Sequence, residues 1–335
     1  MSRKIVLRAA IAIVLIAASG FGVVYLQFNR FIAEPLQQSV NVTIPNGWGL
    51  ARISRELEQK RVISSARWFR ILAKIKKNGF VKAGEYHFLV GQTPVDILNT
   101  LKAGRVVQHR LSFPEGLTIK EMVAIMQKAG LPGSKEILKQ PDLLKKLKVN
   151  APNLEGWFFP DTYQFTRGDT AQDLITRMVV RSKKILAKEY ASRAPDYKLS
   201  SYETLILASI IEKETGVASE RPLISGVFHN RLRKKMKLQT DPTVIYGIKN
   251  FDGNITRKHL KTPTPYNTYT IKGLPPTPIS NPGKEAINAA IHPKASSFLY
   301  FVARGDGSHA FSTTFKQHNA YVDCYQRKKA CNKVK

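Results

Sequence analysis

A run of uncharged residues, Ala9 to Asn29, constrains the fold of this chain more than any other feature of its sequence. A helix of about 20 apolar residues, rising about 1.5 Å per residue, crosses the hydrocarbon core of a bilayer. Three basic residues precede the run: Arg3, Lys4 and Arg8. Because such residues stay on the cytoplasmic side, we expect a cytoplasmic tail over residues 1–8, a transmembrane anchor over 9–29 and a remainder outside the cytoplasm.

A cleavable signal peptide is the alternative interpretation of the same run. Small residues suited to processing lie within it: Ala17, Ala18, Ser19 and Gly20. The apolar stretch continues to Phe28, however, which makes it longer than the apolar region of an ordinary signal peptide. The length favours a retained anchor, and with it a single-pass protein of the cell inner membrane whose main part is periplasmic.

The charge balance is strongly basic, with 53 Lys and Arg residues against 24 Asp and Glu residues and a formal net charge of +29. Such a surface attracts polyanions, and nucleic acid, anionic lipid headgroups and the carboxylate-bearing peptides of the bacterial cell wall all qualify. Export argues against a nucleic-acid partner, and the sequence has no zinc-finger or RNP signature. We therefore expect the membrane and the cell wall as partners, and no nucleic acid.

Cysteine and histidine usage indicates neither redox nor metal chemistry. In an oxidising compartment Cys324 and Cys331 could form a disulfide, but two unpaired thiols fit their spacing as well. The seven histidines show no HExxH motif or other close ligand spacing. We expect no metal site and no cofactor.

A repeated pattern follows the anchor. Three stretches share it: IPNGWGLARISREL from Ile44, FLVGQTPVDILNTL from Phe88 and FPEGLTIKEMVAIM from Phe113. In each, glycine follows three positions after an apolar residue, and apolar residues recur six and ten positions beyond the glycine. This pattern predicts a short strand, a turn that needs glycine, and a helix. The matched positions are Gly47, Gly91 and Gly116, then Ile53, Ile97 and Met122, then Leu57, Leu101 and Met126.

The first two of these units fall within residues 41–108, where the pattern resembles the LysM-like domain that precedes the catalytic part of some wall enzymes. The resemblance implies a peptidoglycan-binding subdomain, and a scaffold without a ligand is the alternative, because glycine turns serve folding first. Between the two units, Ser64 to Lys77 has a serine cap signal and an amphipathic pattern, which predict a surface helix. The lysines at its end are either solvated or in reach of lipid headgroups.

Three later segments bear on the shape of a site. EGWFFPDTY, from Glu155, offers four aromatic rings that could form a platform for sugar rings or belong to the core. GLPPTPISNPG, from Gly273, has few backbone donors and predicts a rigid loop lining a groove. SFLYFVA, from Ser297, and HAFST, from His309, predict a buried strand and a second strand after a Gly-Asp-Gly turn. A sheet packed on helices makes this domain α+β.

The stretch LSSYETLILASIIEKETG, Leu199 to Gly216, predicts a buried helix. Ser200, followed three positions later by Glu203, matches a capping box, and the interior is apolar nearly all round. Gly216 predicts a left-handed stop at the C-terminal end. This helix carries two glutamates, Glu212 and Glu214, to the edge of the core.

Residues two apart on a helix point about 200° away from each other, so Glu212 and Glu214 cannot form one close carboxylate pair. A carboxylate on the last turn feels the negative end of the helix dipole, and desolvation would raise its pKa further towards the range of a general acid. The alternative is that both glutamates are exposed and pair with Lys213 or Arg221.

Two long blocks resemble the MltG or YceG-like family of endolytic murein transglycosylases. They are LASIIEKETGVASERPLISGVFHNRLRKKMKLQTDPTVIYG, from Leu207, and TPYNTYTIKGLPPTPISNPG, from Thr264. EGWFFPDTY and the C-terminal AAIHPKASSFLYFVARGDGSHAFSTTFKQHN match the family pattern too. The resemblance covers nearly everything after the anchor and implies a catalytic domain over residues 109–330.

The resemblance also implies the reaction. In lytic transglycosylases the catalytic acid is a glutamate followed by a small hydroxyl residue at a helix end, which here selects Glu214 with Thr215 as its neighbour. The implied chemistry cleaves the β-1,4 bond between N-acetylmuramic acid and N-acetylglucosamine without water. One carboxylate suffices, because the muramic 6-hydroxyl closes on C1 as a 1,6-anhydro ring.

Further residues are implied as contacts to the sugars: Thr215, Asn230, Gln239, Asp241, Tyr266, Asn267 and Tyr269. Loop architecture is the alternative, because Asp241 before a proline and Asn267 after Thr-Pro-Tyr are natural turn formers. The family would act on nascent glycan strands, end their elongation and work beside peptidoglycan synthases. A wall-binding scaffold without catalysis and a muramidase-type hydrolase are the rival functions.

Overall fold

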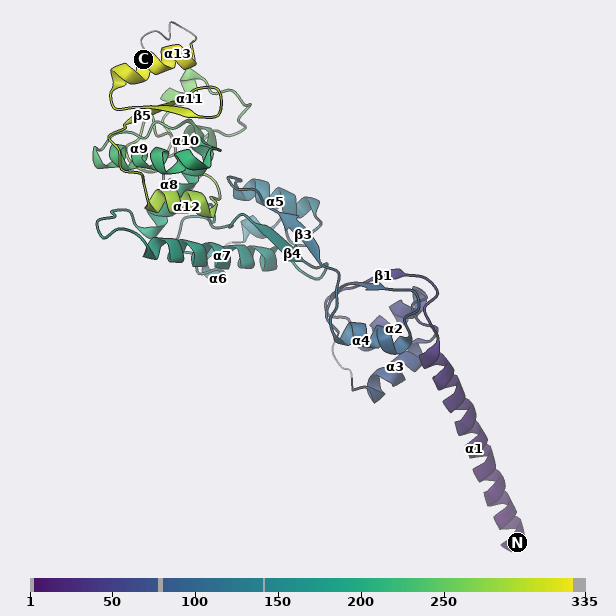
Figure 1. Ribbon diagram of the computed structural model, residues 1–335. Helices are drawn as coiled ribbons and strands as arrows, with labels where there is room; N and C mark the ends of the chain where they lie inside the picture. The colour runs from purple at the N-terminus through teal and green to yellow at the C-terminus, as the bar shows by residue number, and fades with distance from the viewer. Residues whose placement is uncertain (1–2, 78–80, 141, 328–335) are drawn as a thin grey trace. The chain divides into compact units, whose positions relative to one another are not determined.

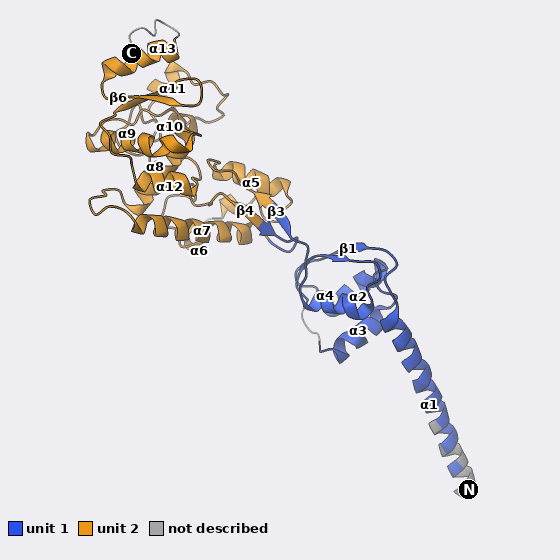
Figure 2. Ribbon diagram, in the orientation of Figure 1, with its two compact units in different colours: residues 1–110, 164–169 blue, residues 111–163, 170–335 orange. Residues whose placement is uncertain are grey.

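A computed structural model describes residues 3–77, 81–140 and 142–327 of the chain. The described part is a mixture of helices and short strands and divides into two compact units. Unit 1 comprises residues 1–110 and 164–169, and unit 2 comprises 111–163 and 170–335 (Figures 1 and 2). The division falls close to the predicted boundary after residue 108, except that 164–169 return to unit 1. The functions predicted for the two parts stay predictions.

Helix α1 (Arg3–Ala33) contains the apolar run. Within the part of the chain that the structure describes, one helical segment, Ile11–Ala33, is long and apolar enough to cross a membrane. This segment is compatible with the single anchor predicted over 9–29.

Unit 1 is built around one antiparallel strand pair. Strand β1 (Val40–Ile44) lies beside β2 (Gly84–Phe88), with Val42 opposite Tyr86. Helices α2 (Leu50–Gln59) and α3 (Ala66–Ile75) connect the two strands, and α4 (Pro94–Lys102) follows. After α1, unit 1 therefore has the order strand, helix, helix, strand, helix.

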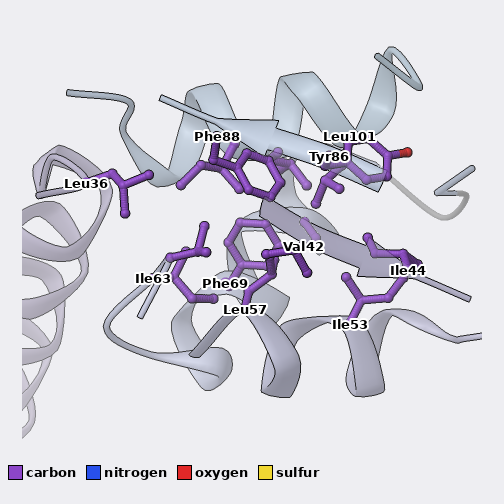
Figure 3. Packing of buried hydrophobic residues seen from close by; sticks show 14 of the residues in the cluster. Leu36, Val42, Ile44, Ile53, Leu57, Ile63, Phe69, Tyr86, Phe88 and Leu101 are labelled. Carbon is purple, nitrogen blue, oxygen red and sulfur yellow. The ribbon is translucent and has the colours of Figure 1, made fainter. Parts of the chain in front are cut away.

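The core of unit 1 lies between the strand pair and its helices (Figure 3). Alternate strand residues point into it, because successive side chains of a strand face opposite sides. The helices contribute residues four apart, such as Ile53 and Leu57 on α2, which are 1% and 0% exposed. Each such side chain contributes about 1.5–3 kcal/mol by leaving water. The predicted helical periodicity is confirmed here.

All three predicted strand, turn and helix units are present. The turn glycines Gly47, Gly91 and Gly116 have φ of +82°, +86° and +78°, a region that favours glycine. The helices α2, α4 and α5 (Ile119–Lys128) follow them, and the third unit begins with β3 (His109–Ser112). The third helix lies in unit 2, so the sequence repeat extends across both units.

Unit 2 is mainly helical. Its elements after α5 are η1 (Ile137–Lys139), α6 (Leu143–Lys146), the first half of β4 (Thr162–Phe165), α7 (Ala171–Ala191), α8 (Ser201–Glu214), η2 (Ala218–Glu220), α9 (Arg221–Arg233), α10 (Asp241–Tyr246), α11 (Arg257–Lys261), α12 (Lys284–Ile291), β5 (Tyr300–Ala303), β6 (His309–Ser312) and α13 (Phe315–Tyr325). The predicted β5 and β6 pair antiparallel, and β3 pairs with β4. Its strands thus form two-stranded ribbons.

Helix α8 is the buried helix that the sequence predicts, and α7, α9, α10 and α12 pack against it. The side chain of Ser200 accepts from the Glu203 N–H, and Glu203 completes the capping box. The predicted left-handed stop is wrong, because Gly216 does not have a positive φ. The helix ends instead because Thr215 is extended, with φ −146° and ψ 134°. A β-branched residue favours that conformation.

The proline-rich segment 273–283 packs on α8. The Ser209 hydroxyl accepts from the Ile279 N–H at 3.0 Å, and the Ser280 hydroxyl donates to the Ser209 carbonyl at 3.1 Å. Both serines are fully buried, so this segment is part of the core that fixes the helix.

The aromatic segment from Glu155 and the two cysteines have the following surroundings in the structure. The aromatic rings of EGWFFPDTY are buried, which favours the core interpretation over an exposed sugar platform. Cys324 is buried at the end of α13 and is not a free thiol, whereas Cys331 lies outside the described residues.

Candidate active site

The two glutamates near the end of α8 have different surroundings, as helical spacing predicts. Glu214 is the last residue of the helix and accepts a hydrogen bond from the Thr240 hydroxyl. Glu212 accepts from the Gly283 N–H at 2.8 Å and from Arg221 Nη2 at 3.3 Å. The two carboxylates therefore do not act as one pair.

Glu212 is enclosed, with 5% of its side chain exposed. Burial raises its pKa, while the Gly283 N–H and the Arg221 guanidinium oppose that rise. The alternative prediction was that both glutamates are exposed and pair with Lys213 or Arg221. For Glu212 the pairing with Arg221 is confirmed, and the predicted exposure is wrong. Glu212 links the end of α8 to the segment after residue 280 and to α9.

Glu214 is surrounded by protein groups but keeps partial contact with solvent. Burial raises its pKa to about 7, the Thr240 hydroxyl lowers it, and the nearby Asp241 carboxylate raises it. The charges of His309 and Arg231 lower it. A carboxyl group with a pKa near neutrality holds and releases a proton readily, which general acid–base catalysis requires.

Asp241 lies beside this glutamate at the start of α10. The Tyr269 hydroxyl donates to Asp241 Oδ1 at 2.7 Å. Burial, the Asp241 carboxylate and Glu214 all raise the pKa of Tyr269, so its hydroxyl stays protonated and remains a donor. The site therefore holds two nearby carboxylates from different elements, Glu214 and Asp241, each bonded by a hydroxyl group.

Buried threonines fix the hydroxyl that contacts Glu214. The Thr240 N–H donates to Thr268 Oγ1 at 3.1 Å, and the hydroxyls of Thr243 and Thr268 are 2.8 Å apart. Thr243 Oγ1 also donates to the Thr240 carbonyl at 2.8 Å. Gln239, just before this network, is exposed and has a φ of +50°, and its N–H donates to the Thr268 carbonyl at 3.2 Å.

The two asparagines implied by the resemblance are buried and bonded to backbone. The Asn267 amide donates to the carbonyls of His259, Leu260 and Thr262. The Asn230 amide donates to the carbonyls of Ser296 and Phe298, at 2.8 and 2.9 Å. Both amides hold loops in place.

Tyr266 and Thr215 are engaged locally. The hydroxyls of Tyr266 and Thr277 are 2.8 Å apart, and the Tyr266 ring packs edge-on against Tyr246 with centroids 4.8 Å apart. The Thr215 hydroxyl accepts from the Val217 N–H at 3.0 Å. Of the eight residues implied by the resemblance, Asp241 and Tyr269 share a hydrogen bond. Glu214 interacts with both of them electrostatically.

Sequence reasoning missed three residues that lower the pKa of Glu214: Thr240, Arg231 and His309. Thr240 had no motif of its own within QTDPT. Arg231 is buried on α9, where its guanidinium donates to the Leu299 and Leu238 carbonyls at 2.6 Å. His309 on β6 lies 2.7 Å from Glu220. A basic residue at a buried position of a predicted helix could have pointed to Arg231. No local pattern points to His309, because it comes near Glu214 only through the fold.

A further buried carboxylate, Glu155, lies elsewhere in unit 2. It accepts from the Ile119 N–H at 3.0 Å, from the Asn281 amide at 3.2 Å and from the Tyr246 hydroxyl at 3.1 Å. Burial raises its pKa to about 7, against the lowering effect of the Ile119 N–H and the Tyr246 hydroxyl. Because Tyr246 ends α10 and Asp241 begins it, Glu155 anchors the helix that carries part of the candidate site.

Across residues 3–77, 81–140 and 142–327, no group of three or more His, Cys, Asp or Glu side chains is arranged to hold a metal ion.

Known proteins resemble this chain over most of its length. A family model described as the YceG-like family matches residues 42–324. An endolytic murein transglycosylase of Bacillus subtilis is 31% identical over 320 residues, which cover 89% of each chain. An endolytic murein transglycosylase of Streptococcus pneumoniae is 30% identical over 298 residues, which are 79% of this chain and 54% of that protein.

A solved structure supports the same relationship. The crystal structure of a YceG-like protein from Listeria monocytogenes is 33% identical and superposes with a TM-score of 0.57. The match covers 84% of this chain and 99% of that one.

Proposed function

The chain belongs to the YceG-like family, and from this premise we propose that it is an endolytic murein transglycosylase, a lyase that cuts the glycan strands of peptidoglycan. The observation that carries the chemistry is Glu214, a partly exposed residue at a helix end whose buried carboxyl group has a pKa of about 7.

In the proposed reaction Glu214 first acts as an acid. It donates its proton to the glycosidic oxygen as the bond from that oxygen to C1 of N-acetylmuramic acid breaks. The resulting carboxylate then takes the proton of the muramic 6-hydroxyl, whose oxygen forms the new bond to C1. The products are a 1,6-anhydromuramoyl end and a free hydroxyl on N-acetylglucosamine, and Glu214 regains its proton.

This scheme explains why one carboxylate can serve as both acid and base. The nucleophile comes from the substrate, so no second carboxylate is needed to activate water or to bond to C1, as glycoside hydrolases require. A pKa near 7 suits both halves of the cycle, because the group must give up a proton and then take one back.

Other residues around Glu214 assist the proposed reaction. Asp241 would stabilise positive charge that develops at C1, and its hydrogen bond from the Tyr269 hydroxyl supports this role by orienting the carboxylate. The exposed Gln239 is available for sugar hydroxyl or acetamido groups. Thr215, Asn230, Tyr266 and Asn267 act as positioning residues for the loops around these groups, since their polar atoms contact protein.

The proposal extends to location and partners. The apolar helix α1 would anchor the enzyme in the cell inner membrane by a single span, with the N-terminus cytoplasmic and the later residues periplasmic. Nascent glycan strands emerge at that membrane surface, so cleavage there would end elongation beside peptidoglycan synthases. The strand, helix, helix, strand order within unit 1 supports a LysM-like, glycan-binding role.

Digestion of uncrosslinked nascent glycan, followed by mass spectrometry of the products, tests the proposal. The wild-type chain should release fragments ending in 1,6-anhydro-N-acetylmuramic acid. Fragments with a reducing muramic acid would instead indicate a muramidase-type hydrolase. Glycan binding without any cleavage would indicate a scaffold.

A further inference from the structure

The apolar helix α1 runs into the core of unit 1 without an intervening loop. Leu26 is 68% exposed, Phe28 is partly buried and Phe31 is 3% exposed, so the surroundings of the helix change within two turns. Phe31 belongs to the hydrophobic core of unit 1, and Phe28 and Ile32 pack against it. The last turn of the apolar helix is therefore embedded in protein.

The length of the uncharged run fixes where the membrane would end. From Ala9, the first residue after Arg8, about 20 residues of helix span roughly 30 Å, the thickness of the hydrocarbon core. The outer end of the span then falls near Phe28. That is the residue at which the exposed apolar surface of α1 gives way to contact with unit 1.

Helix α3 lies at this same level of unit 1. The Trp68 ring contacts the Phe28 ring, with centroids 5.7 Å apart. Figure 1 shows α3 on the side of unit 1 from which α1 leaves. Tryptophan is enriched at the boundary between lipid tails and headgroups, which is where this contact would place Trp68.

The outer face of α3 carries a basic stripe, which we define as Arg67, Arg70 and Lys74. The spacing of three and four residues puts them on one side of the helix, and all three are exposed. The opposite side, which includes Phe69 and Leu72, is buried in the core. In the described part of the chain, none of the three forms an ion pair with a carboxylate. Ile75, at the end of α3, is 60% exposed.

We propose that α3 is an interfacial helix whose basic stripe binds the phosphate groups of anionic lipids and holds unit 1 against the membrane. The inference rests on the membrane anchor in the proposed function. Lipid headgroups are the favoured ligand because the stripe lies on the helix that contacts the end of the span. Each basic residue at an anionic surface strengthens binding by a factor of about five, so three give on the order of a hundredfold.

A spin label at Ile75→Cys in the full chain measures this contact. The chain is inserted in vesicles of phosphatidylcholine, alone or with phosphatidylglycerol in equal parts, and the depth of the label is read from its accessibility to oxygen and to a polar nickel chelate. With phosphatidylglycerol the label should lie at headgroup depth. Replacing the basic stripe by glutamine should lower the ratio of docked to free unit 1 on the order of a hundredfold.

A charge-matched variant provides the control. Lys135→Gln, Lys184→Gln and Lys188→Gln remove the same charge from exposed positions of unit 2 and should leave the label at headgroup depth. The inference is overturned if the label lies in water on vesicles that contain phosphatidylglycerol. It is also overturned if the label lies at the same depth in both lipid mixtures and in both triple variants.

Two separate assays distinguish this failure from failure of the proposed function. Flotation of the vesicles reports insertion of α1, and a chain that does not float overturns the anchor together with the inference. Cleavage of soluble glycan reports the enzyme, and it should be equal in both triple variants, because none of these residues lies in the candidate site.

Discussion

Replacing Glu214 by glutamine removes the exchangeable proton while keeping the size of the side chain. We expect product formation to fall by a factor of about 10²–10⁴, the usual contribution of a general acid–base group. Thermal unfolding should change little or shift upward, because the variant no longer buries an ionisable group. Fragment release from nascent glycan and a melting curve measure the two quantities on the same sample.

Glu212→Gln on the same helix is the matched control and should show the opposite pattern. It keeps an acceptor for the Gly283 N–H but leaves the guanidinium of Arg221 without its nearest carboxylate. Stability should fall by about 3 kcal/mol, the low end for a broken buried pair, because Glu115 remains 3.8 Å from Arg221. Activity should persist below the melting transition. A fully folded but inactive Glu212→Gln variant would contradict this division of roles.

The hydroxyl of Thr240 should tune the protonation of Glu214. With a pKa of about 7, the acid form of Glu214 is lost as the pH rises, so kcat/KM should fall about tenfold per pH unit above that value. The Thr240 hydroxyl favours the carboxylate form and lowers the pKa. Thr240→Val should therefore move the alkaline limb of the pH–rate profile to higher pH.

Thr240→Ser separates this effect from a change in packing. Serine retains the hydroxyl, so the limb should return to the wild-type position. A profile that is the same in the valine, serine and wild-type chains would exclude the hydroxyl as the group that sets the pKa.

At the scale of the element, Glu155 makes stability depend on pH through α10. Its folded-state pKa is raised from 4.5 to about 7, so the folded protein binds the proton more tightly than the unfolded chain. The stabilisation is fully present below pH about 4.5 and is lost as the pH rises to about 7, by up to roughly 3 kcal/mol. Glu212 and Glu214, with raised pKa values, add slopes of the same sign.

Glu155→Gln isolates the contribution of this one group. The amide oxygen can accept from Ile119 and Asn281, and the Tyr246 hydroxyl can turn to accept from the amide nitrogen. Denaturant unfolding between pH 4.5 and about 7 should show a smaller loss of stability for the variant than for the wild type. Parallel curves would mean that Glu155 does not change its protonation over this range.

The turn between β1 and α2 offers a matched pair of glycines. Neither Gly47 nor Gly49 has a neighbouring atom that an added methyl group would meet, but Gly47 has a φ of +82° and Gly49 a φ of −80°. Gly47→Ala should lower the free energy of unfolding by about 1–2 kcal/mol through backbone strain alone. Gly49→Ala should lower it by less, about 0.5–1 kcal/mol, because Gly49 is the N-cap of α2 and alanine is a poorer N-cap than glycine. Equal effects would show that the backbone angle is not the reason for the glycine.

Local patterns allowed much of the fold to be predicted from the sequence. The turn glycines, the capping box at Ser200 and the β5–β6 hairpin depend on residues near one another in the chain, and all are confirmed. The end of α8 was misjudged, because Thr215 stops the helix in place of a left-handed Gly216.

The candidate site could be predicted only in part. Helical spacing separated Glu212 from Glu214, and the family resemblance selected one of them. The contacts that set their pKa values come from distant segments, such as Thr240 for Glu214 and Gly283 for Glu212. No local sequence pattern predicts contacts between residues that are 26 or 71 positions apart. For the same reason the role of Glu155 became visible only in the fold.

At the scale of the whole molecule, each unit has its own task in the proposed function. Unit 1 carries the apolar helix and the basic stripe, and unit 2 carries Glu214 and its neighbours. The net charge of +29 suits both tasks, because a membrane surface and a wall polymer are both anionic.

The chain passes between the two units three times, after residues 110, 163 and 169. A unit joined to its neighbour by one linker can be lost, gained or exchanged by a single recombination event. Unit 1 cannot, because a cut after residue 110 leaves its segment 164–169 behind in the remaining gene. The two units should therefore be inherited together, and the family match over residues 42–324, which spans both, is the pattern that such joint inheritance leaves.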